Sequence, residues 1–312
     1  MNVIETRDLS KSYKKFFSFR KFVALDRLNL DVPEGSIFGF LGLNGAGKTT
    51  TIKLLLALAY PSGGTGTLLG KPIGNVKIKE RIGFLPEEAY YQRHLTATAF
   101  LDFMGKALHM DSSHRKKRIS ELLHLVGLGD KGSSKMSTFS KGMLQRIGVA
   151  QALLNDPDLV ILDEPLTGLD PKGRAELKYI MSTLKEKGKT VFFSSHILSD
   201  VQSICDHVAI LNRGRLIYQG LIEDLLSVET IEIRAQNVPA TVVEKIEKIA
   251  KSISKEGTEW IFSAADDGVR GEILRILHEG NLQEESVSLC YAELEPVFLE
   301  LIEKDNQNRD NS

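Results

Sequence analysis

Eight residues, 42–49, carry the clearest chemistry in this sequence. They read Gly-Leu-Asn-Gly-Ala-Gly-Lys-Thr, which fits the G-x-x-x-x-G-K-[ST] pattern of a phosphate-binding loop between a strand and a helix. Small residues let backbone N–H groups close around phosphate oxygens, and the following helix directs its positive end at the same anion. Lys48 supplies an ammonium for the phosphates, and the Thr49 hydroxyl is a candidate Mg²⁺ ligand. The candidate binding residues of this stretch are Gly42, Leu43, Asn44, Gly45, Ala46, Gly47, Lys48, Thr49 and Thr50.

The flanks of this loop supply the expected context. Residues 37–41 form an apolar run short enough for a buried strand. Residues 50–59 are leucine-rich and end at Pro61 and two glycines, as a helix should. A glycine-rich turn with a chance lysine would not need these neighbours. The sequence therefore predicts that the chain binds a nucleoside triphosphate.

A second centre follows another apolar run. Residues 159–162 predict a fully buried strand, and Asp163 and Glu164 come directly after it. In enzymes with a phosphate loop, an acid at this place holds Mg²⁺, and the next one can polarise the attacking water as a general base. Pro165 favours an extended conformation at Glu164.

Three further positions are candidates because of where they stand in the chain. His196 follows a buried strand, at the sheet edge where α/β proteins bind ligands, although a lone histidine is usually structural. Glu87 follows an apolar strand over 81–85, and it either faces a ligand or is one of two solvated glutamates on a turn. Ser140 opens a helix over 143–154, where its hydroxyl either binds an anion or caps the helix.

Two basic stretches leave alternatives open. Tyr13 lies in a basic, aromatic loop over 11–21, between alternating strands at 2–8 and 22–32, and its ring either stacks on a nucleotide base or packs as an ordinary tyrosine. Residues 112–118 are a basic run that suits a nucleic-acid patch or a solvated helix face. The solvated face is favoured because acidic and apolar residues follow at once.

The composition is that of an ordinary globular protein. The 312 residues are 42% hydrophobic and 26% charged with a net charge of −1, which suggests about two domains and no nucleic-acid partner. Cys205 and Cys290 match no metal spacing and favour reduced thiols in the cytosol. We expect no transmembrane segment and no signal peptide, so that any membrane role comes through a partner.

Taken together, residues 1–222 resemble the ATP-binding subunit of an ABC transporter, because the motifs occur in that family's order. The resemblance implies that residues 42–49 are the Walker A loop and that Tyr13 stacks on adenine. It implies that Asp163 and Glu164 are the Walker B acid and the catalytic base. It also implies that the switch histidine, which contacts the γ-phosphate, is the residue at 196, so that catalysis rests on Glu164, His196 and Lys48.

The resemblance also covers Phe139-Ser140-Lys141-Gly142-Met143, which matches the signature that reads LSGGQ in most members. Ser140 and Gly142, which carry its anion contact, are kept, whereas Lys141 and Met143 depart from the pattern. Glu87 stands where the family usually has glutamine; a carboxylate can ligate Mg²⁺ but cannot donate a hydrogen bond when ionised. These departures resemble the type-2 exporter branch that includes daunorubicin-resistance-type ATPases.

The chain has one Walker A loop and one signature. In the family the signature serves the ATP of the opposite subunit, so the resemblance implies a homodimer with two composite sites, closed by ATP and opened by hydrolysis. It further implies that this motion drives a separate multi-span membrane permease docked near residues 88–110. The expected location is therefore the cytoplasm, peripheral at the inner face of the cell membrane.

The predicted fold is α/β. Residues 1–222 are expected to form a P-loop NTPase domain of ABC ATPase type, which includes an antiparallel β subdomain. A helical subdomain is inserted at about 88–156 and is expected to be helical throughout 95–129. A small α/β accessory domain, regulatory or dimer-supporting, is expected over 223–303, and a disordered polar tail over 304–312. The expected elements of the accessory domain are strands at 230–234, 259–263 and 286–289 and helices at 240–254, 271–279 and 295–302.

Two other functions stay open beside an ATPase subunit that uses ATP and Mg²⁺. A soluble ABC ATPase acting on translation or DNA usually carries two cassettes or long coiled-coil insertions, and this sequence has neither. A binding-only subunit would have a degenerate site, whereas Lys48, Asp163, Glu164 and His196 are all in place.

Overall fold

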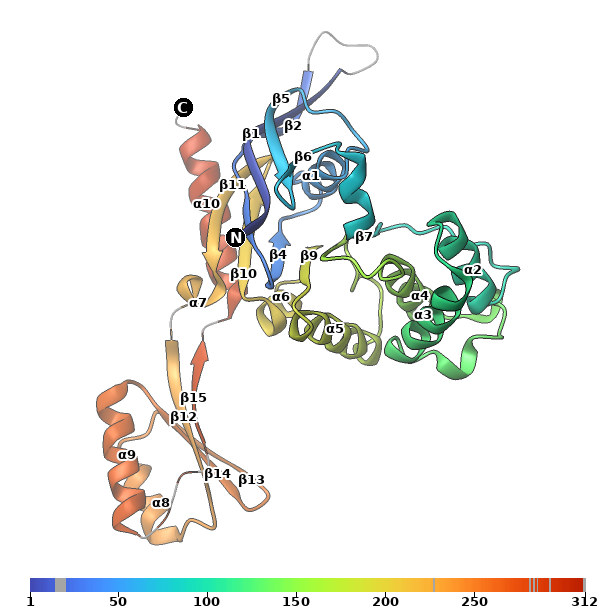
Figure 1. The fold of residues 1–312 in the computed structure, drawn as a ribbon. Coiled ribbons are helices and arrows are strands. Elements are labelled where there is room, and N and C mark those ends of the chain that lie inside the picture. The colour runs from blue at the N-terminus through green and yellow to red at the C-terminus, as the bar shows by residue number, and fades with distance from the viewer. Residues whose placement is uncertain are drawn as a thin grey trace. The chain divides into compact units, whose positions relative to one another are not determined.

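The computed structural model describes residues 1–14, 21–226, 228–280, 282, 284, 286–291 and 293–310. The chain forms two compact units, which are described separately (Figure 1). The larger unit comprises Met1–Ile222 together with Phe298–Ser312, and the smaller unit comprises Glu223–Val297.

A six-stranded sheet in the order β11-β10-β4-β9-β8-β7 is the centre of the larger unit. Neighbouring strands from β10 to β7 run parallel, and β11 pairs antiparallel with β10. Strands β4, β8 and β9 are buried along their whole length, as parallel strands covered on both faces should be. The strands are β4 (Ile37–Leu41), β7 (Ile82–Leu85), β8 (Leu159–Leu162), β9 (Thr190–Ser195), β10 (His207–Asn212) and β11 (Arg215–Leu221).

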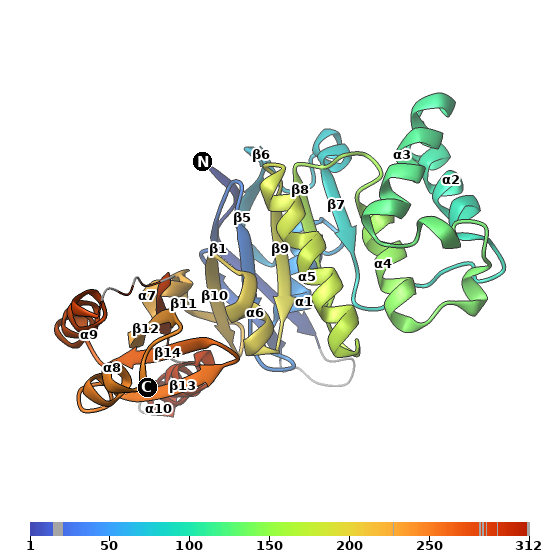
Figure 2. The ribbon, with the colours of Figure 1, turned by 90° about the horizontal axis from the view of Figure 1, so that it is seen from below.

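Helices cover both faces of this sheet (Figure 2). Helices α5 (Pro171–Glu186) and α6 (Leu198–Ile204) pack against β4 and β9. Helix α1 (Lys48–Leu55) lies on the other face, in a core that also includes residues of an antiparallel sheet. Because β4 runs directly into α1, the segment between them stands at the carboxyl edge of the sheet, where α/β proteins bind ligands.

The antiparallel sheet has the order β2-β1-β5-β6, with β3 paired to β1. Its strands are β1 (Asn2–Lys14), β2 (Lys21–Leu28), β3 (Asp31–Pro33), β5 (Gly63–Leu68) and β6 (Lys71–Pro72), and the 3₁₀ helix η1 (Val76–Arg81) follows. Tyr13 lies within β1, opposite Phe22 of β2, and not in a loop as predicted. Residues 15–20 of that predicted loop lie outside the described residues.

Three helices form the insertion between β7 and β8: α2 (Ala97–Ala107), α3 (Ser112–Leu125) and α4 (Lys141–Ala152). The short 3₁₀ helices η2 (Gly129–Lys131) and η3 (Met136–Thr138) precede α4. The prediction of a helix throughout 95–129 was wrong. The chain turns after α2 through His109, which has a φ of +56°, and Asp111 caps α3 by accepting from the N–H of Ser113 at 2.9 Å.

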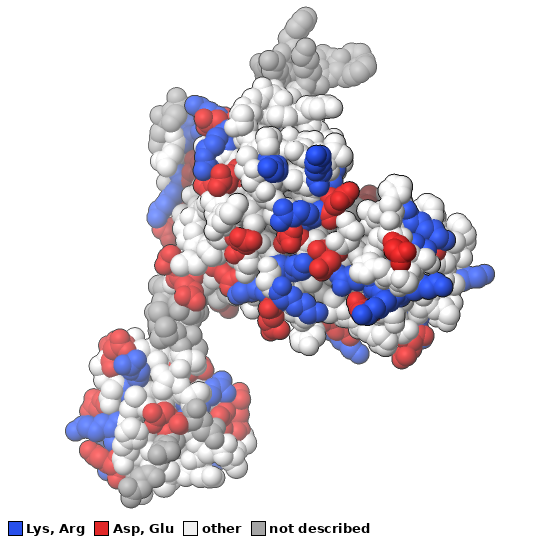
Figure 3. Space-filling view, viewed as in Figure 1, with Lys and Arg blue, Asp and Glu red and all other residues white. Residues whose placement is uncertain are grey.

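The basic run 112–118 is tied into this insertion by ion pairs. Arg115 is buried, and its Nε lies 2.7 Å from Asp102 Oδ1. Arg118 Nη2 lies 3.2 Å from Asp156 Oδ1. Over the larger unit, Lys and Arg are interspersed with Asp and Glu on the face shown in Figure 3. These pairings favour the solvated-face interpretation of the run over a nucleic-acid patch.

The smaller unit begins within the short helix α7 (Ile222–Leu225) and has β-α-β-β-α-β connectivity. Its four strands pair antiparallel in the order β13-β14-β12-β15, which is the ferredoxin-like arrangement. Its elements are β12 (Val228–Gln236), α8 (Ala240–Ile246), β13 (Ser252–Glu256), β14 (Glu259–Ala264), α9 (Asp267–Glu279) and β15 (Ser286–Tyr291). The expected helix over 240–254 was therefore wrong in its second half, because Ser252–Glu256 pairs with β14 across a hairpin.

The last helix, α10 (Leu294–Asp310), overturns the prediction of a disordered tail from residue 304. From Phe298 on, the chain belongs to the larger unit, so the accessory domain does not continue to 303 as expected. The physical reason is a set of hydrogen bonds between this polar segment and Asn212 at the end of β10. Ser227 and residues 311–312 of the predictions lie outside the described residues.

Candidate active site

The glycines of the loop between β4 and α1 are required by its geometry. Gly45 and Gly47 have φ angles of +81° and +114°, a region that favours glycine. A Cβ on Gly47 would lie 2.7 Å from the carbonyl oxygen of Ala24. The first N–H groups of α1 have no acceptor within the helix, so they are available to an anion in the loop.

A cleft of about 590 Å³ opens at this loop, a size that suits a nucleotide. It is lined by Phe22, Ala24, Asn44, Gly45, Ala46, Gly47, Lys48, Thr49, Thr50, Glu87, Glu164, Thr167 and His196. Residues from five separate segments therefore meet where the sequence predicted phosphate binding.

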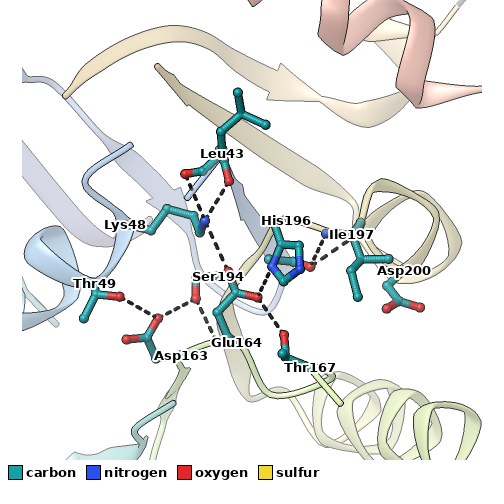
Figure 4. Close-up of polar contacts among 12 residues, drawn as sticks. Leu43, Lys48, Thr49, Asp163, Glu164, Thr167, Ser194, His196, Ile197 and Asp200 are labelled. Atoms are coloured by element: carbon teal, nitrogen blue, oxygen red, sulfur yellow. Dashed lines mark hydrogen bonds and ion pairs between the residues drawn. The ribbon is translucent and has the colours of Figure 1, made fainter. Parts of the chain in front are cut away.

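Lys48 bridges the loop and the end of β8 (Figure 4). Its Nζ donates to the carbonyl oxygen of Gly42 at 2.6 Å and lies 3.5 Å from that of Leu43. The same nitrogen lies 3.2 Å from Glu164 Oε1, and the two side chains are only 6% and 7% exposed. Two charges buried this deeply each need the other or an equivalent partner.

The carboxylate of Glu164 is held at its second oxygen as well. Oε2 accepts a hydrogen bond from Thr167 Oγ1 at 3.0 Å and lies 2.8 Å from His196 Nδ1, which must carry the proton when Glu164 is ionised. Glu164 has a φ of +49°, so the prediction of an extended conformation before Pro165 was wrong. Its backbone N–H donates to Ser194 Oγ at 2.8 Å, and these contacts together hold the uncommon conformation.

Asp163 is bound to two hydroxyl groups. Ser194 Oγ donates to Asp163 Oδ1 at 2.6 Å, and Thr49 Oγ1 lies 3.5 Å from the same oxygen. Burial raises the pKa of Asp163, although the hydrogen bonds from Ser194 and Thr49 act in the opposite direction. Thr49 and Asp163, with Glu87 in the cleft wall, offer the oxygen donors that Mg²⁺ prefers, so the residues fit this metal.

Ser140 and Gly142, two of the predicted binding residues, lie away from the cleft. Ser140 caps α4 by accepting from the N–H of Met143 at 3.3 Å, and with Gly142 it lines a separate hollow of about 380 Å³. Gly168 and Asp170, after β8, line the same hollow. Within the described part of one chain, the signature residues therefore do not reach the phosphate loop.

Tyr13 is not among the described residues that line the cleft. Its ring lies 5.0 Å from the ammonium of Lys11, and adenine stacking by Tyr13 stays a prediction. Phe22, opposite Tyr13 across the strand pair, lines the cleft instead. The aromatic side chain that faces the cleft thus comes from the neighbouring strand.

Sequence reasoning missed four residues of this site: Phe22, Ala24, Thr167 and Ser194. Ser194 could have been found by the argument used for His196, since both stand at the end of one buried strand. Thr167 gives no such signal. Its hydroxyl meets Glu164 only because the chain turns after β8.

Residues 25–167 of the chain match the ABC transporter family. An uncharacterised ABC transporter ATP-binding protein of Synechocystis is 50% identical over 228 residues, which are 72% of this chain and 64% of that protein. A bacitracin transport ATP-binding protein of Bacillus licheniformis is 35% identical over 96% of this chain and 97% of its own. A Nod factor export ATP-binding protein of Burkholderia lata is 32% identical over 92% and 94%.

The fold has solved relatives too. The structure of an ATP-binding subunit of an ABC transporter matches 72% of this chain and 91% of its own, with 31% identity and a TM-score of 0.62. The matched share is close to that of the larger unit.

Replacing Ser194 with Ala should remove one hydrogen bond from Asp163 and one from the backbone of Glu164. It removes the hydrogen bond to Asp163, so the raised pKa of Asp163 should rise further, and the carboxylate should become protonated at a higher pH. We expect the acid limb of the ATPase pH profile to move to higher pH, and the rate at neutral pH to fall about threefold to tenfold, as the loss of one or two hydrogen bonds predicts.

The matched control is Ser203→Ala on α6, whose hydroxyl accepts from Lys178 away from the cleft. Its pH profile should equal that of the unmodified protein. An acid limb that does not move in Ser194→Ala would show that Ser194 does not set the ionisation of Asp163.

Proposed function

This chain belongs to the ATP-binding proteins of ABC transporters, and we propose that its ATP hydrolysis powers export through a separate membrane permease. The observation that carries the catalytic part is the carboxylate of Glu164, which is shared among Lys48 of the phosphate loop, Thr167 and His196. A base held by three partners beside a phosphate-binding loop is placed to activate a water molecule for attack on a terminal phosphate.

The cleft residues have distinct tasks in this proposal. Lys48 and the N–H groups at the start of α1 bind the phosphates. Thr49, Asp163 and Glu87 would hold Mg²⁺, which neutralises phosphate charge. Glu164 takes a proton from the attacking water. The oxygen of that water bonds to the γ-phosphorus, the bond between the γ-phosphorus and the β-phosphate oxygen breaks, and ADP and phosphate are released. His196 and Thr167 keep the carboxylate of Glu164 in place.

The proposed active form is a homodimer with two composite sites. Support comes from the separation, within one chain, of the cleft from the hollow that contains Ser140 and Gly142. Ser140 opens an α-helix of 12 residues, whose N-terminus favours an anion. Its hydroxyl and the Gly142 backbone would complete the phosphate cage of the other subunit, and a two-fold axis would form both sites at once.

Export is proposed from the relatives that match along most of the chain. One carries bacitracin transport in its name and another Nod factor export, and both alignments include the smaller unit. The smaller unit would support the dimer or regulate it. Among the described residues, no helix has both the length and the apolarity to cross a bilayer. In this proposal the chain sits at the cytoplasmic face of the membrane through its permease.

A second hollow suits the docking of that permease. It measures about 430 Å³, and it shares Glu87, Glu164 and Thr167 with the nucleotide cleft. The other lining residues are Glu88, Ala89, Tyr90, Tyr91, Arg93, Lys141, Leu144 and Gln145. A segment bound there would reach Glu87 directly, which couples docking to the state of the cleft.

Replacing Glu164 with Gln should stop turnover while ATP binding is kept. The amide cannot accept the proton, so kcat should fall by about 10²- to 10⁴-fold, the usual contribution of a general base. Light scattering with ATP and Mg²⁺ should then show a stable dimer. Glu186→Gln on the exposed side of α5 is the matched control and should turn over normally.

Two outcomes would contradict this proposal. A monomer in ATP and Mg²⁺ would contradict the composite dimer. Unchanged turnover would remove Glu164 from the role of base. Lys48→Ala separates the steps, since it should lose ATP binding itself, and unchanged nucleotide affinity would contradict the phosphate-loop assignment.

Affinity capture from detergent-solubilised membranes should recover a multi-span permease. Tyr90, highly exposed at the second hollow, provides a variant: Tyr90→Arg should reduce the recovered permease, whereas Tyr179→Arg on α5 should not. Mass spectrometry identifies what is captured. Recovery of ribosomes or DNA in place of a permease would favour the soluble ATPase and overturn the transport proposal.

A further inference from the structure

Asn212 is a buried polar residue at the end of β10, only 4% exposed. Its side-chain Nδ2 donates to Asp305 Oδ2 at 2.7 Å and to Asn306 Oδ1 at 3.2 Å. Its backbone oxygen accepts from Arg309 Nη2 at 3.0 Å. All three partners belong to the part of α10 that lies in the larger unit. A buried amide left without such partners would destabilise the fold.

The turn that follows Asn212 contacts the phosphate loop. Gly214 donates its N–H to the carbonyl oxygen of Ala46 at 2.8 Å. The carbonyl oxygen of Leu211 would lie 2.6 Å from a Cβ on Gly42, and the Leu211 side chain 3.1 Å from one on Gly47. The end of β10 and the turn that follows it therefore pack closely against the loop at Gly42, Ala46 and Gly47, so a shift of this segment would displace the loop.

The same turn contacts the opposite wall of the cleft. The carbonyl oxygen of Gly214 accepts from the N–H of Asp26 at 2.8 Å, and Arg215 Nε lies 2.6 Å from Asp26 Oδ2. Ala24 lines the cleft two residues earlier on β2. Arg213 and Gly214 have φ angles of +46° and +81°, as in a tight hairpin turn of fixed shape.

We propose that Arg309 and Asp305 of α10 are positioning residues for ATP binding, acting through Asn212 and the β10–β11 turn on the phosphate loop. Neither lines the cleft among the described residues, so their effect passes through the backbone of the turn. Arg309 also lies 3.0 Å from Asp305 through its Nε, an ion pair that holds the two side chains together on one helix face. The inference rests on the proposed function in one respect, namely that the ligand of the loop is ATP.

The placement has a consequence for the smaller unit. Helix α10 begins at Leu294, and the residues before Phe298 belong to that unit. The smaller unit is thus continuous, along one helix, with the residues that hold the turn.

Replacing Arg309 with Ala tests the inference in the full-length chain. The dissociation constant of a fluorescent ATP analogue and the KM for ATP should both rise about tenfold, equivalent to about 1.4 kcal/mol, while kcat changes less than about twofold. Arg309→Lys keeps a charged donor and should restore both constants to within about threefold. Lys304→Ala removes an exposed ion pair with Glu300 on the same helix and should change neither.

Each outcome bears on the proposal. A lower unfolding temperature for Arg309→Ala with an unchanged dissociation constant would show a merely structural contact and overturn it. If Arg309→Ala does not fold, Asp305→Ala, which removes the acceptor of the Asn212 amide and the ion-pair partner of Arg309, is measured in its place; an unchanged dissociation constant there overturns the proposal too. Failure of the unmodified protein to bind ATP would instead contradict the proposed function.

Discussion

Lys48 Nζ and Glu164 Oε1 lie 3.2 Å apart in a place where both side chains are almost fully buried. This ion pair joins the helix after β4 to the end of β8, and β9 lies between those strands in the sheet. Removing either charge would leave the other buried without its opposite charge, at a cost of about 3–5 kcal/mol. The relative position of the phosphate loop and Glu164, the proposed general base, is therefore held by charge as well as by packing.

The two oxygens of Glu164 have different partners, and this divides their tasks. Oε1 faces the ammonium, whereas Oε2 is held by Thr167 and His196. A phosphate in the loop competes with Oε1 for the same lysine, while Oε2 keeps its two hydrogen-bonding neighbours. Ser194, central between them on β9, bonds both to Asp163 and to the backbone of Glu164. In the proposed mechanism, phosphate in the loop would therefore change the surroundings of Glu164 through Lys48.

The predictable part of the site is the part encoded over short stretches. The phosphate loop and the acids after β8 are each a strand followed at once by chemistry, so local pattern suffices for Lys48, Thr49 and Asp163. Ser194 and Thr167 act through tertiary hydrogen bonds; the place of Ser194 at the end of a buried strand marks it as a candidate, whereas no spacing reveals Thr167. From its sequence alone the α10 segment has the composition of a polar tail. The hydrogen bonds that order it join Asp305 and Arg309 to Asn212, which lies about ninety residues earlier in the chain. Pairing with β14 likewise overrode the helical pattern expected at Ser252–Glu256.

The central claim is that one chain supplies half of each site, and mixing two inactive variants tests it most directly. Lys48→Ala lacks the loop lysine but keeps the signature. Ser140→Asp keeps the helix cap but places a negatively charged carboxylate next to the phosphate, which it repels. A dimer of one variant with the other contains one intact composite site. The account predicts that each variant alone hydrolyses almost no ATP and that the mixture recovers activity, about a quarter of the unmodified rate for random pairing of independent sites. No recovery from a mixture shown to contain mixed dimers, or full activity of Ser140→Asp alone, would contradict it.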